Sequence, residues 1–280
     1  MAKPLDDSPS LAEMPLYQHL DRIASGLAAE GIGPTDPIPV QALGGLDQWH
    51  YHGTEAVEFA AHRLQIGPTS HVLDLGSGIG GPARYLADRY GCRVTAVELQ
   101  SELNAIAEDL TRRSGLAGLV THVCDDAAAH RFPEASFSVA VSWLAILHMP
   151  DRRRLFRNIA PSLEVGGKLL IEDLCSRKPF SAPDLHDLRH VVYGITVTSV
   201  DAYVADLASA GLTSVQVEDL TPDWAPYAAQ RLTAWRANRA EYVRVHGAAA
   251  YAGQERFYAV IDRLYESGSL GGVRLIASRR

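Results

Sequence analysis

Cysteine is scarce in this chain, and long apolar runs are missing. The three cysteines, Cys92, Cys124 and Cys175, are odd in number and far apart, which excludes a disulfide framework and fits a reducing compartment. The longest apolar stretch, residues 139–147, is too short to cross a bilayer. The N-terminal residues carry no apolar segment typical of a secretory signal. We therefore predict a cytoplasmic protein with no membrane span.

Basic residues are fewer than acidic ones. Lys and Arg number 26 and Asp and Glu number 33, so the net charge of −7 argues against a nucleic-acid partner. Hydrophobic residues make up 47% of the 280 residues, which excludes disorder and allows a sizeable core. We expect no metal site, because His186 and His190, four residues apart on a predicted helix, have no evident third ligand.

Strand and helix patterns alternate from residue 70 onward. Short apolar runs predict strands at residues 71–75, 93–97, 119–123, 137–142, 168–172, 214–217 and 272–277. Helical spacing between these runs predicts an α/β fold with a parallel sheet and helices on both faces. Ligands in such sheets bind at the carboxyl ends of the strands.

Two helical regions lie outside this alternation. One helix is predicted over residues 16–30, in an N-terminal extension, and two more within residues 221–270. We expect four parts: a cap with a closing loop, a core, a helical insert and a last core strand, at residues 1–65, 66–220, 221–270 and 271–280. The N-terminal helix, with Leu16 and Tyr17, is a candidate for covering the site or pairing subunits in a homo-oligomer.

A glycine-rich stretch follows the first predicted strand. Gly76, Gly78 and Gly81 fit the spacing of a dinucleotide fingerprint, and Glu98, 22 positions after Gly76, is placed to accept from ribose hydroxyls. Two interpretations compete: a nicotinamide or flavin enzyme, and an enzyme with another nucleoside cofactor. Asp74 favours the second, because a carboxylate beside the first glycine repels a pyrophosphate and suits a cofactor with a cationic end.

At this point the sequence resembles class I S-adenosylmethionine-dependent methyltransferases. Residues 74–80, Asp-Leu-Gly-Ser-Gly-Ile-Gly, look like their first motif, and Glu98 looks like their ribose-binding acid. Asp126, followed by Ala127, resembles the aspartate that contacts the adenine amino group, with Asp125 as the neighbouring alternative.

A narrower likeness joins two segments. Residues 80–84, Gly-Gly-Pro-Ala-Arg, and the upstream residues 49–53, Trp-His-Tyr-His-Gly, are similar to the branch that includes tocopherol, sterol C-24 and sarcosine/dimethylglycine methyltransferases. The sterol-like enzymes often have an acid shortly after the position of Ser142, where this chain has Trp143 and Leu144, and this departure argues against a sterol substrate.

The resemblance implies a Rossmann-like fold and a defined activity. The expected reaction is methyl transfer from S-adenosylmethionine to a carbon or nitrogen of a small molecule, such as a secondary metabolite, by in-line displacement. The expected cofactor-binding residues are Gln48, Asp74, Gly76, Ser77, Gly78, Gly80, Glu98, Leu99, Asp125, Asp126, Ala127 and Ser142.

Three residues are candidates for catalysis: His148, His50 and Tyr51. His148 follows the fourth predicted strand, at the edge where a general base is useful, although a buried core histidine is an equal alternative. Residues 48–52 form either a loop that closes over the site or a packed surface turn, and we favour the loop. Aromatic side chains near the acceptor, including Trp49 and Trp143, are suited to stabilise a developing cation.

The acceptor pocket is expected from residues 1–65 and 177–270. Four arginines of the insert, Arg231, Arg236, Arg239 and Arg244, are candidates for meeting an anionic substrate, but we prefer a solvated helix face for them. Two other function classes stay open. They are a nicotinamide-dependent oxidoreductase, supported only by the glycine spacing and Glu98, and a catalytically inactive cofactor-binding partner subunit.

Overall fold

The computed structural model describes residues 20–280, apart from the side chains of residues 245 and 246. The predicted helix over residues 16–30 is present as α1 (Asp21–Ala29). Leu16 and Tyr17, and the first nineteen residues of the predicted cap, lie outside the described residues.

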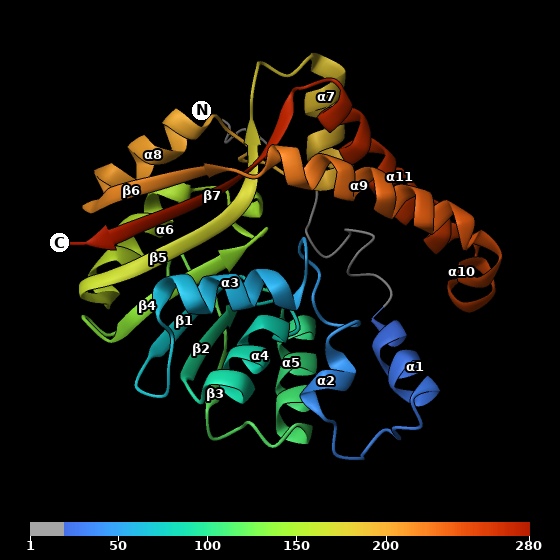
Figure 1. The fold of residues 1–280 in the computed structure, drawn as a ribbon, viewed down its shortest axis with the longest axis horizontal. Helices are drawn as coiled ribbons and strands as arrows, with labels where there is room; N and C mark the ends of the chain where they lie inside the picture. Colours follow the sequence, from blue (N-terminus) through green and yellow to red (C-terminus); the bar gives the residue numbers. More distant parts are fainter. Residues whose placement is uncertain (1–19) are drawn as a thin grey trace, which may run out of the picture.

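A seven-stranded sheet forms the centre of the molecule, in the order β3-β2-β1-β4-β5-β7-β6 (Figure 1). Its strands are β1 (His71–Leu75), β2 (Arg93–Glu98), β3 (Val120–Cys124), β4 (Phe137–Trp143), β5 (Leu163–Ser176), β6 (Leu212–Asp219) and β7 (Leu270–Arg279). The strands β3, β2, β1, β4 and β5 pair in parallel, which confirms the predicted α/β sheet.

The last strand departs from the predicted parallel arrangement. Strand β7 runs antiparallel to both of its neighbours, β5 and β6. The register explains why: Asp219, the last residue of β6, lies opposite Val273, near the start of β7. The insert between these strands therefore stays at the carboxyl edge of the sheet, and a chain that returns from that edge has to run backwards through the sheet.

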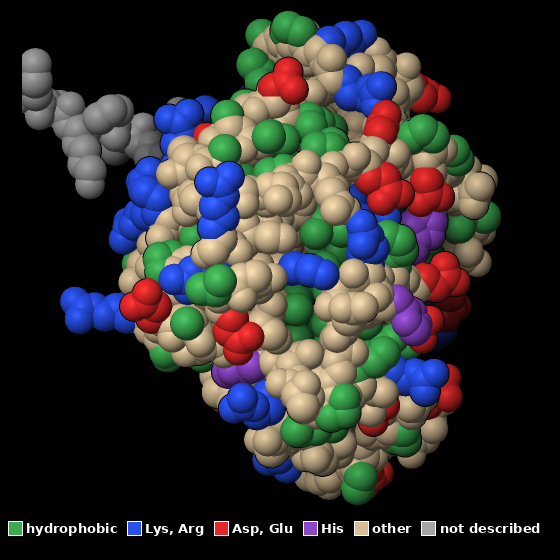
Figure 2. All heavy atoms as spheres, turned by 60° about the vertical axis from the view of Figure 1, so that its left-hand side comes forward, with side chains coloured by type: hydrophobic (Ala, Val, Ile, Leu, Met, Phe, Trp, Pro, Cys, Tyr) green, Lys and Arg blue, Asp and Glu red, His purple; other side chains and the backbone are tan. Residues whose placement is uncertain are grey.

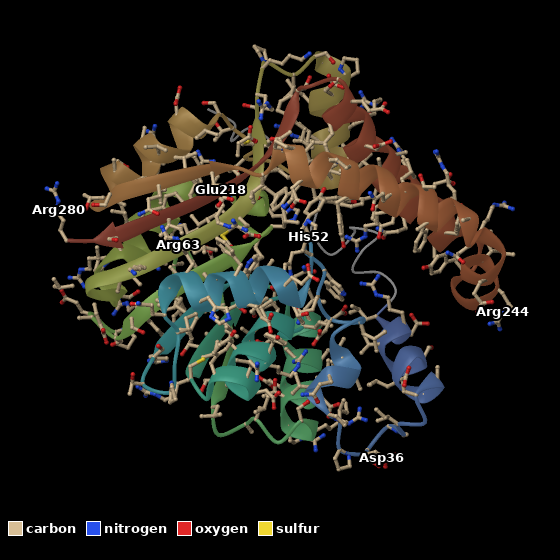
Figure 3. All side chains as sticks on the ribbon, viewed as in Figure 1. Asp36, His52, Arg63, Glu218, Arg244 and Arg280 are labelled. Atoms are coloured by element: carbon tan, nitrogen blue, oxygen red, sulfur yellow. The ribbon has the colours of Figure 1, made fainter. Side chains whose placement is uncertain are left out.

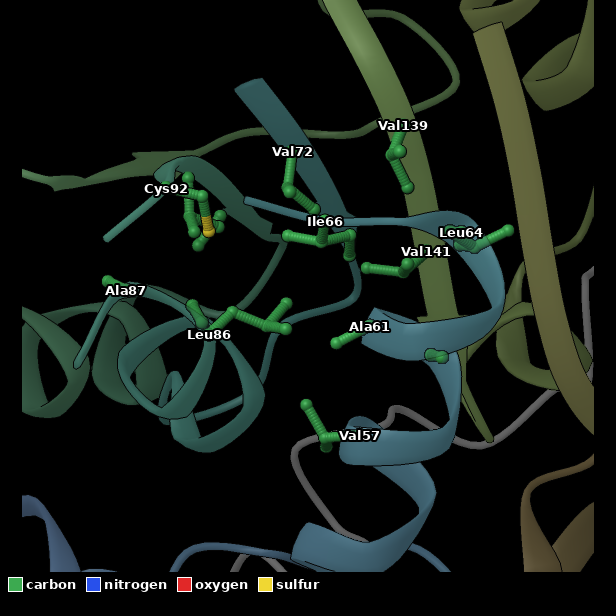
Figure 4. Packing of buried hydrophobic residues seen from close by; sticks show 14 of the residues in the cluster. Val57, Ala61, Leu64, Ile66, Val72, Leu86, Ala87, Cys92, Val139 and Val141 are labelled. Carbon is green, nitrogen blue, oxygen red and sulfur yellow. The ribbon is translucent and has the colours of Figure 1, made fainter. Parts of the chain in front are cut away.

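Helices cover both faces of the sheet. One face carries α3 (Thr54–Leu64), α4 (Gly81–Tyr90) and α5 (Ser101–Arg113), and the other carries α6 (Arg152–Ile159) and α8 (Val200–Ser209). Successive residues of β1 point to opposite faces. Val72 packs in the cluster with Val57 of α3 and Leu86 of α4, as Figure 4 shows, whereas Leu73 packs with Phe156 of α6.

The insert contains three helices where two were predicted: α9 (Thr221–Ala237), α10 (Arg239–His246) and α11 (Ala248–Glu266). The break before α11 lies at Gly247, whose φ of 83° ends the helical path. Helices α9 and α11 pack along each other and join Leu147, Leu174 and Val192 in one apolar cluster. The insert therefore covers the carboxyl edge of β4 and β5.

Shorter elements complete the chain: α2 (Val40–Leu43), η2 (Ile146–His148), η3 (Ala160–Ser162), α7 (Ala182–Asp187) and the π-helical turn η4 (Leu188–Val192). The rings of His186 and His190 lie 4.5 Å apart, and within residues 20–280 no third metal-ligating side chain joins them. Every helix in this part of the chain is too short or too polar to span a membrane. On the face shown in Figure 2, basic and acidic side chains are interspersed with hydrophobic and neutral ones.

Candidate active site

The glycine-rich loop connects β1 to the N-terminus of α4, at the carboxyl edge of the sheet. Gly76, Gly78 and Gly80 have φ angles of 70°, 55° and 78°, a region that other residues rarely adopt. A Cβ atom on Gly76 would lie 2.4 Å from the Cβ of Ala145, so a side chain there does not fit. The N–H groups of Gly76 and Ser77 donate to the carbonyl oxygen of Val97, and that of Gly80 donates to the carbonyl oxygen of Ser77. The loop is therefore fixed from within, and it ends at the N-terminus of α4, where a helix presents unpaired N–H groups.

Two carboxylates lie at the base of this loop. Asp74 is only 2% exposed, and its Oδ2 has no hydrogen-bond partner within the described residues. Burial, and then the nearby charge of Glu98, raise the pKa of Asp74 to about 7. Glu98 accepts hydrogen bonds from the backbone N–H groups of Gly78 and Gln100, both at 2.9 Å, and burial raises its pKa. A cation beside Asp74 would satisfy its free oxygen and favour its charged form.

The loop over residues 45–53 forms the opposite wall. A buried ion pair of 2.9 Å between Asp47 and Arg84 ties this loop to α4. The Nε2 of His50 donates to the carbonyl oxygen of Gly53 at 2.9 Å, and its ring stacks on Trp143 at 5.5 Å between centroids. Burial lowers the pKa of His50 to about 4, so this imidazole is neutral at pH 7. The loop is thus held against α4, and its closing over a ligand stays a prediction.

The other two candidate catalytic residues also face the cavity. Tyr51 stacks on Trp224 of α9 at 4.3 Å, and burial raises its pKa to about 12, so it is a protonated phenol at neutral pH. His148 donates from Nδ1 to the carbonyl oxygen of Tyr193 at 2.8 Å. This bond fixes the tautomer and leaves a lone pair on Nε2. Burial lowers the pKa of His148, which keeps it neutral and able to accept a proton.

These groups surround one cavity of about 1100 Å³, its open mouth included. Its walls include residues from the segments 47–51, 74–82 and 143–148, and the facing sides of α9 and α11. Figure 3 shows this junction: His52, at the end of the closing loop, lies beside α9, where its Nε2 is 2.8 Å from a carboxylate oxygen of Asp223. The cavity is therefore enclosed jointly by the core, the N-terminal loop and the insert.

The residues predicted to hold an adenine lie outside this cavity, along the carboxyl ends of β2 and β3. Leu99 is 58% exposed. Asp126 accepts from the backbone N–H of Ala128 at 2.9 Å, and Asp125 pairs with His130 at 2.8 Å. Ala127 is buried in the core. The two aspartates therefore both support the turn after β3, and the geometry alone does not select one of them.

Three further predicted residues also lie outside the cavity wall. Ser142 is fully buried and donates from Oγ to the carbonyl oxygen of Leu75 at 3.0 Å, so it joins the ends of β4 and β1. Gly80 is packed closely, since a Cβ atom there would lie 2.7 Å from His122. Gln48 donates to Asp47 at 3.1 Å, and its Oε1 has no partner in the described chain.

The sequence interpretation of the insert arginines was wrong for Arg231. Its side chain is half-buried and lines the cavity, near Gln254 of α11. The other three are exposed: Arg236, Arg239 and Arg244. Arg231 follows Ala228 by three positions and Gln254 precedes Tyr258 by four, so both lie on the inner faces of their helices. This helical spacing is the signal that the sequence analysis missed.

Comparison with known proteins agrees with this geometry. Residues 73–171 match the protein family described as "Methyltransferase domain". Phosphoethanolamine N-methyltransferase 1 of Zea mays is 30% identical over 191 residues, which cover 68% of this chain and 38% of that protein. Sarcosine/dimethylglycine N-methyltransferase of Halorhodospira halochloris is 32% identical over 164 residues, which cover 56% of each chain.

Solved structures show the same fold. A phosphoethanolamine N-methyltransferase of Haemonchus contortus, crystallised with S-adenosyl-L-methionine, has a TM-score of 0.78 at 18% identity, and the match covers 96% of this chain and 58% of that one. Geranyl diphosphate C-methyltransferase of Streptomyces coelicolor, in complex with S-adenosyl-L-homocysteine, has a TM-score of 0.69 at 19% identity. The match covers 97% of this chain and 100% of that one.

The fold is thus the Rossmann-like fold of these methyltransferase structures, as the sequence predicted. Residues 73–171 match a methyltransferase domain, and the resemblance to methyltransferases that the sequence indicated is confirmed. The chain spans 38% and 56% of the length of the two curated relatives described above.

Proposed function

We propose that this protein is an S-adenosylmethionine-dependent methyltransferase that acts on a small molecule. The observation that carries the proposal is Asp74, which lines the cavity beside the glycine-rich loop and whose buried Oδ2 has no hydrogen-bond partner among the described residues. The cofactor carries an ammonium and a carboxylate at one end and a ribose at the other, and it has no phosphate. The acid at Asp74 suits such a cofactor and disfavours a nicotinamide dinucleotide.

The described residues fit the cofactor along its length. Asp74 would hold the ammonium, and the Oγ of Ser77, which has no partner among the described residues, would hold the carboxylate together with the N-terminus of α4. Glu98 would accept from the ribose hydroxyls, because its two carboxylate oxygens offer about four lone pairs and the backbone N–H groups of Gly78 and Gln100 use two of them. Leu99 and Asp126 would flank the adenine, at the carboxyl ends of β2 and β3.

The bound cofactor would supply an electrophilic methyl group on its sulfonium. The protein has to align the acceptor and exclude water, and the joint walls of loop 45–53 and the insert are suited to both. A carbon or protonated nitrogen acceptor must lose a proton, and the neutral His148 offers a lone pair for it. His50, also neutral, is the second candidate base. The protonated Tyr51 suits hydrogen-bond donation.

We also infer a cytoplasmic location, because Cys92, Cys124 and Cys175 are all free thiols. The four-part division at residues 65, 220 and 270 and pairing of copies through the N-terminal helix remain predictions. The curated relatives act on phosphoethanolamine and on sarcosine or dimethylglycine, so small amines are the first acceptors to examine.

Calorimetric titration with S-adenosylhomocysteine, with NAD in parallel, tests the proposed cofactor. Micromolar binding of S-adenosylhomocysteine and none of NAD is the expected result. Binding of NAD alone would overturn the proposal and return the oxidoreductase interpretation. Binding of S-adenosylhomocysteine without turnover on any acceptor would instead favour an inactive partner subunit.

A further inference from the structure

One side of the cavity has polar groups that the cofactor does not explain. Arg231 of α9 lines the cavity, and within residues 20–280 its guanidinium forms no ion pair or hydrogen bond. Its described contact is the face of Tyr258, 5.1 Å from the ring centre. A half-buried guanidinium that lies beside a mainly apolar wall and has no ion-pair partner among the described residues is suited to bind a ligand that carries the opposite charge.

Gln254 provides a second, independent observation. It is 6% exposed, it lines the same cavity, and its Nε2 has no hydrogen-bond partner among the described residues. Gln254 lies one turn before Tyr258 on α11, and this ring is the one that Arg231 covers. The insert therefore presents a cation and an unsatisfied amide N–H at the same part of the wall.

The position of these groups separates them from the cofactor end of the cavity. Arg231, Gln254 and Tyr258 line both the cavity and a neighbouring groove between α1 and the helices α9, α10 and α11. Asp74 and Ser77 line the cavity only. The two insert residues are thus at the outer boundary of the cavity, whereas the groups proposed for the cofactor are at its base.

We propose that Arg231 and Gln254 form a subsite for an oxyanion of the methyl acceptor, a carboxylate or a phosphate, which rests on the proposed methyltransferase function. The guanidinium presents several N–H donors in one plane, which match two oxygens of such a group, and the amide of Gln254 adds another donor. The aromatic and aliphatic wall around them then takes the uncharged body of the acceptor.

The bound oxyanion would also change the pKa values of two candidate catalytic residues, His50 and Tyr51. The charge of Arg231 contributes to the lowered pKa of His50, and it also acts to lower the pKa of Tyr51. Arg231 therefore lies close enough for an anion bound to it to change the pKa values of both residues. Neutralising Arg231 removes one cause of the low basicity of His50. An anionic acceptor would therefore make this candidate base more basic as it binds.

The test uses protein saturated with S-adenosylhomocysteine and three pairs of probes. Each pair is an anionic compound and its counterpart without the anion: sarcosine and sarcosinamide, phosphoethanolamine and ethanolamine, geranyl diphosphate and geraniol. Calorimetry measures the affinity for each probe in wild type, Arg231→Gln, Arg231→Lys and Arg236→Gln. Arg236 is the matched control because it lies on the same helix, is exposed and pairs with Glu255.

We expect at least one anionic probe to bind, and its counterpart to bind about 10- to 100-fold more weakly. Arg231→Gln should remove that difference, Arg231→Lys should restore part of it, and Arg236→Gln should leave it unchanged. Three results would overturn the subsite: equal binding of both members of every pair, no binding of any anionic probe, or a loss confined to S-adenosylhomocysteine affinity in Arg231→Gln. Failure of the unmodified protein to bind S-adenosylhomocysteine would instead refute the proposed function.

Discussion

The ion pair between Asp47 and Arg84 links the closing loop to the core, and its loss should destabilise the protein strongly. Arg84 is fully buried, and apart from Asp47 its guanidinium makes only two long hydrogen bonds, each 3.3 Å, to the carbonyl oxygen of Ala107 and to Thr111. Asp47→Asn would leave that charge buried without its counter-ion. Breaking a buried pair on one side costs about 3–5 kcal/mol.

Urea denaturation followed by circular dichroism measures this loss. Asp88→Asn is the matched control, because Asp88 is an exposed acid on the same helix as Arg84 and should change the unfolding free energy by less than about 0.5 kcal/mol. If Asp47→Asn lowers the unfolding free energy by no more than Asp88→Asn does, the reasoning is refuted.

The double variant Asp47→Leu/Arg84→Met sharpens the test. Burial raises the pKa of Asp47 and lowers that of Arg84, which shows that desolvation outweighs their attraction. Replacing both charges by apolar side chains should therefore recover most of the stability that Asp47→Asn loses. If the double variant is less stable than Asp47→Asn, the unpaired buried charge of Arg84 is not the cause of the stability lost in Asp47→Asn.

Three predictions concern the site itself. Glu98→Ala should weaken S-adenosylhomocysteine binding by about 10- to 100-fold in calorimetry, because the ribose hydroxyls lose their charged acceptor; unchanged affinity would remove Glu98 from the cofactor site. His148→Ala should lower turnover about 100-fold or more while S-adenosylhomocysteine affinity stays the same, as expected for a base that contacts only the acceptor; full activity would make His148 a packing residue. The affinity for S-adenosylhomocysteine should rise as the pH increases through about 7, because Asp74 has its pKa there and only its ionised form pairs with the ammonium. Asp74→Asn should flatten that profile, and an unaltered profile in the variant would exclude Asp74 as its cause.

The sequence predicts well those features of the fold that residues close together in the chain determine. The loop from Gly76 to Gly80 follows an apolar strand and precedes a helix, so its place at the sheet edge comes from local order. Within the predicted loop 48–52, residues 49–51 line the cavity, and that the loop closes over a ligand stays a prediction. Strand β7, whose direction depends on where the insert begins and ends, was expected to be parallel and is antiparallel.

Contacts between distant segments were beyond the sequence analysis. Asp47 and Arg84 are 37 positions apart, and nothing in the local pattern of either residue predicts that they pair. Arg231 shares α9 with one exposed arginine, Arg236, and composition does not show which of the two turns inward. Only the packing of α9 against α11 and the core decides this.

The closing loop couples the insert to the cofactor side of the cavity. Within this loop, consecutive residues stack on different parts of the protein: His50 on Trp143 of the core, and Tyr51 on Trp224 of α9. Asp47 fixes the start of the same loop to α4, the helix that follows the glycine-rich loop. A shift of α9 on binding an acceptor at Arg231 would therefore reach the glycine-rich loop through five residues of chain, so acceptor and cofactor affinities should be coupled.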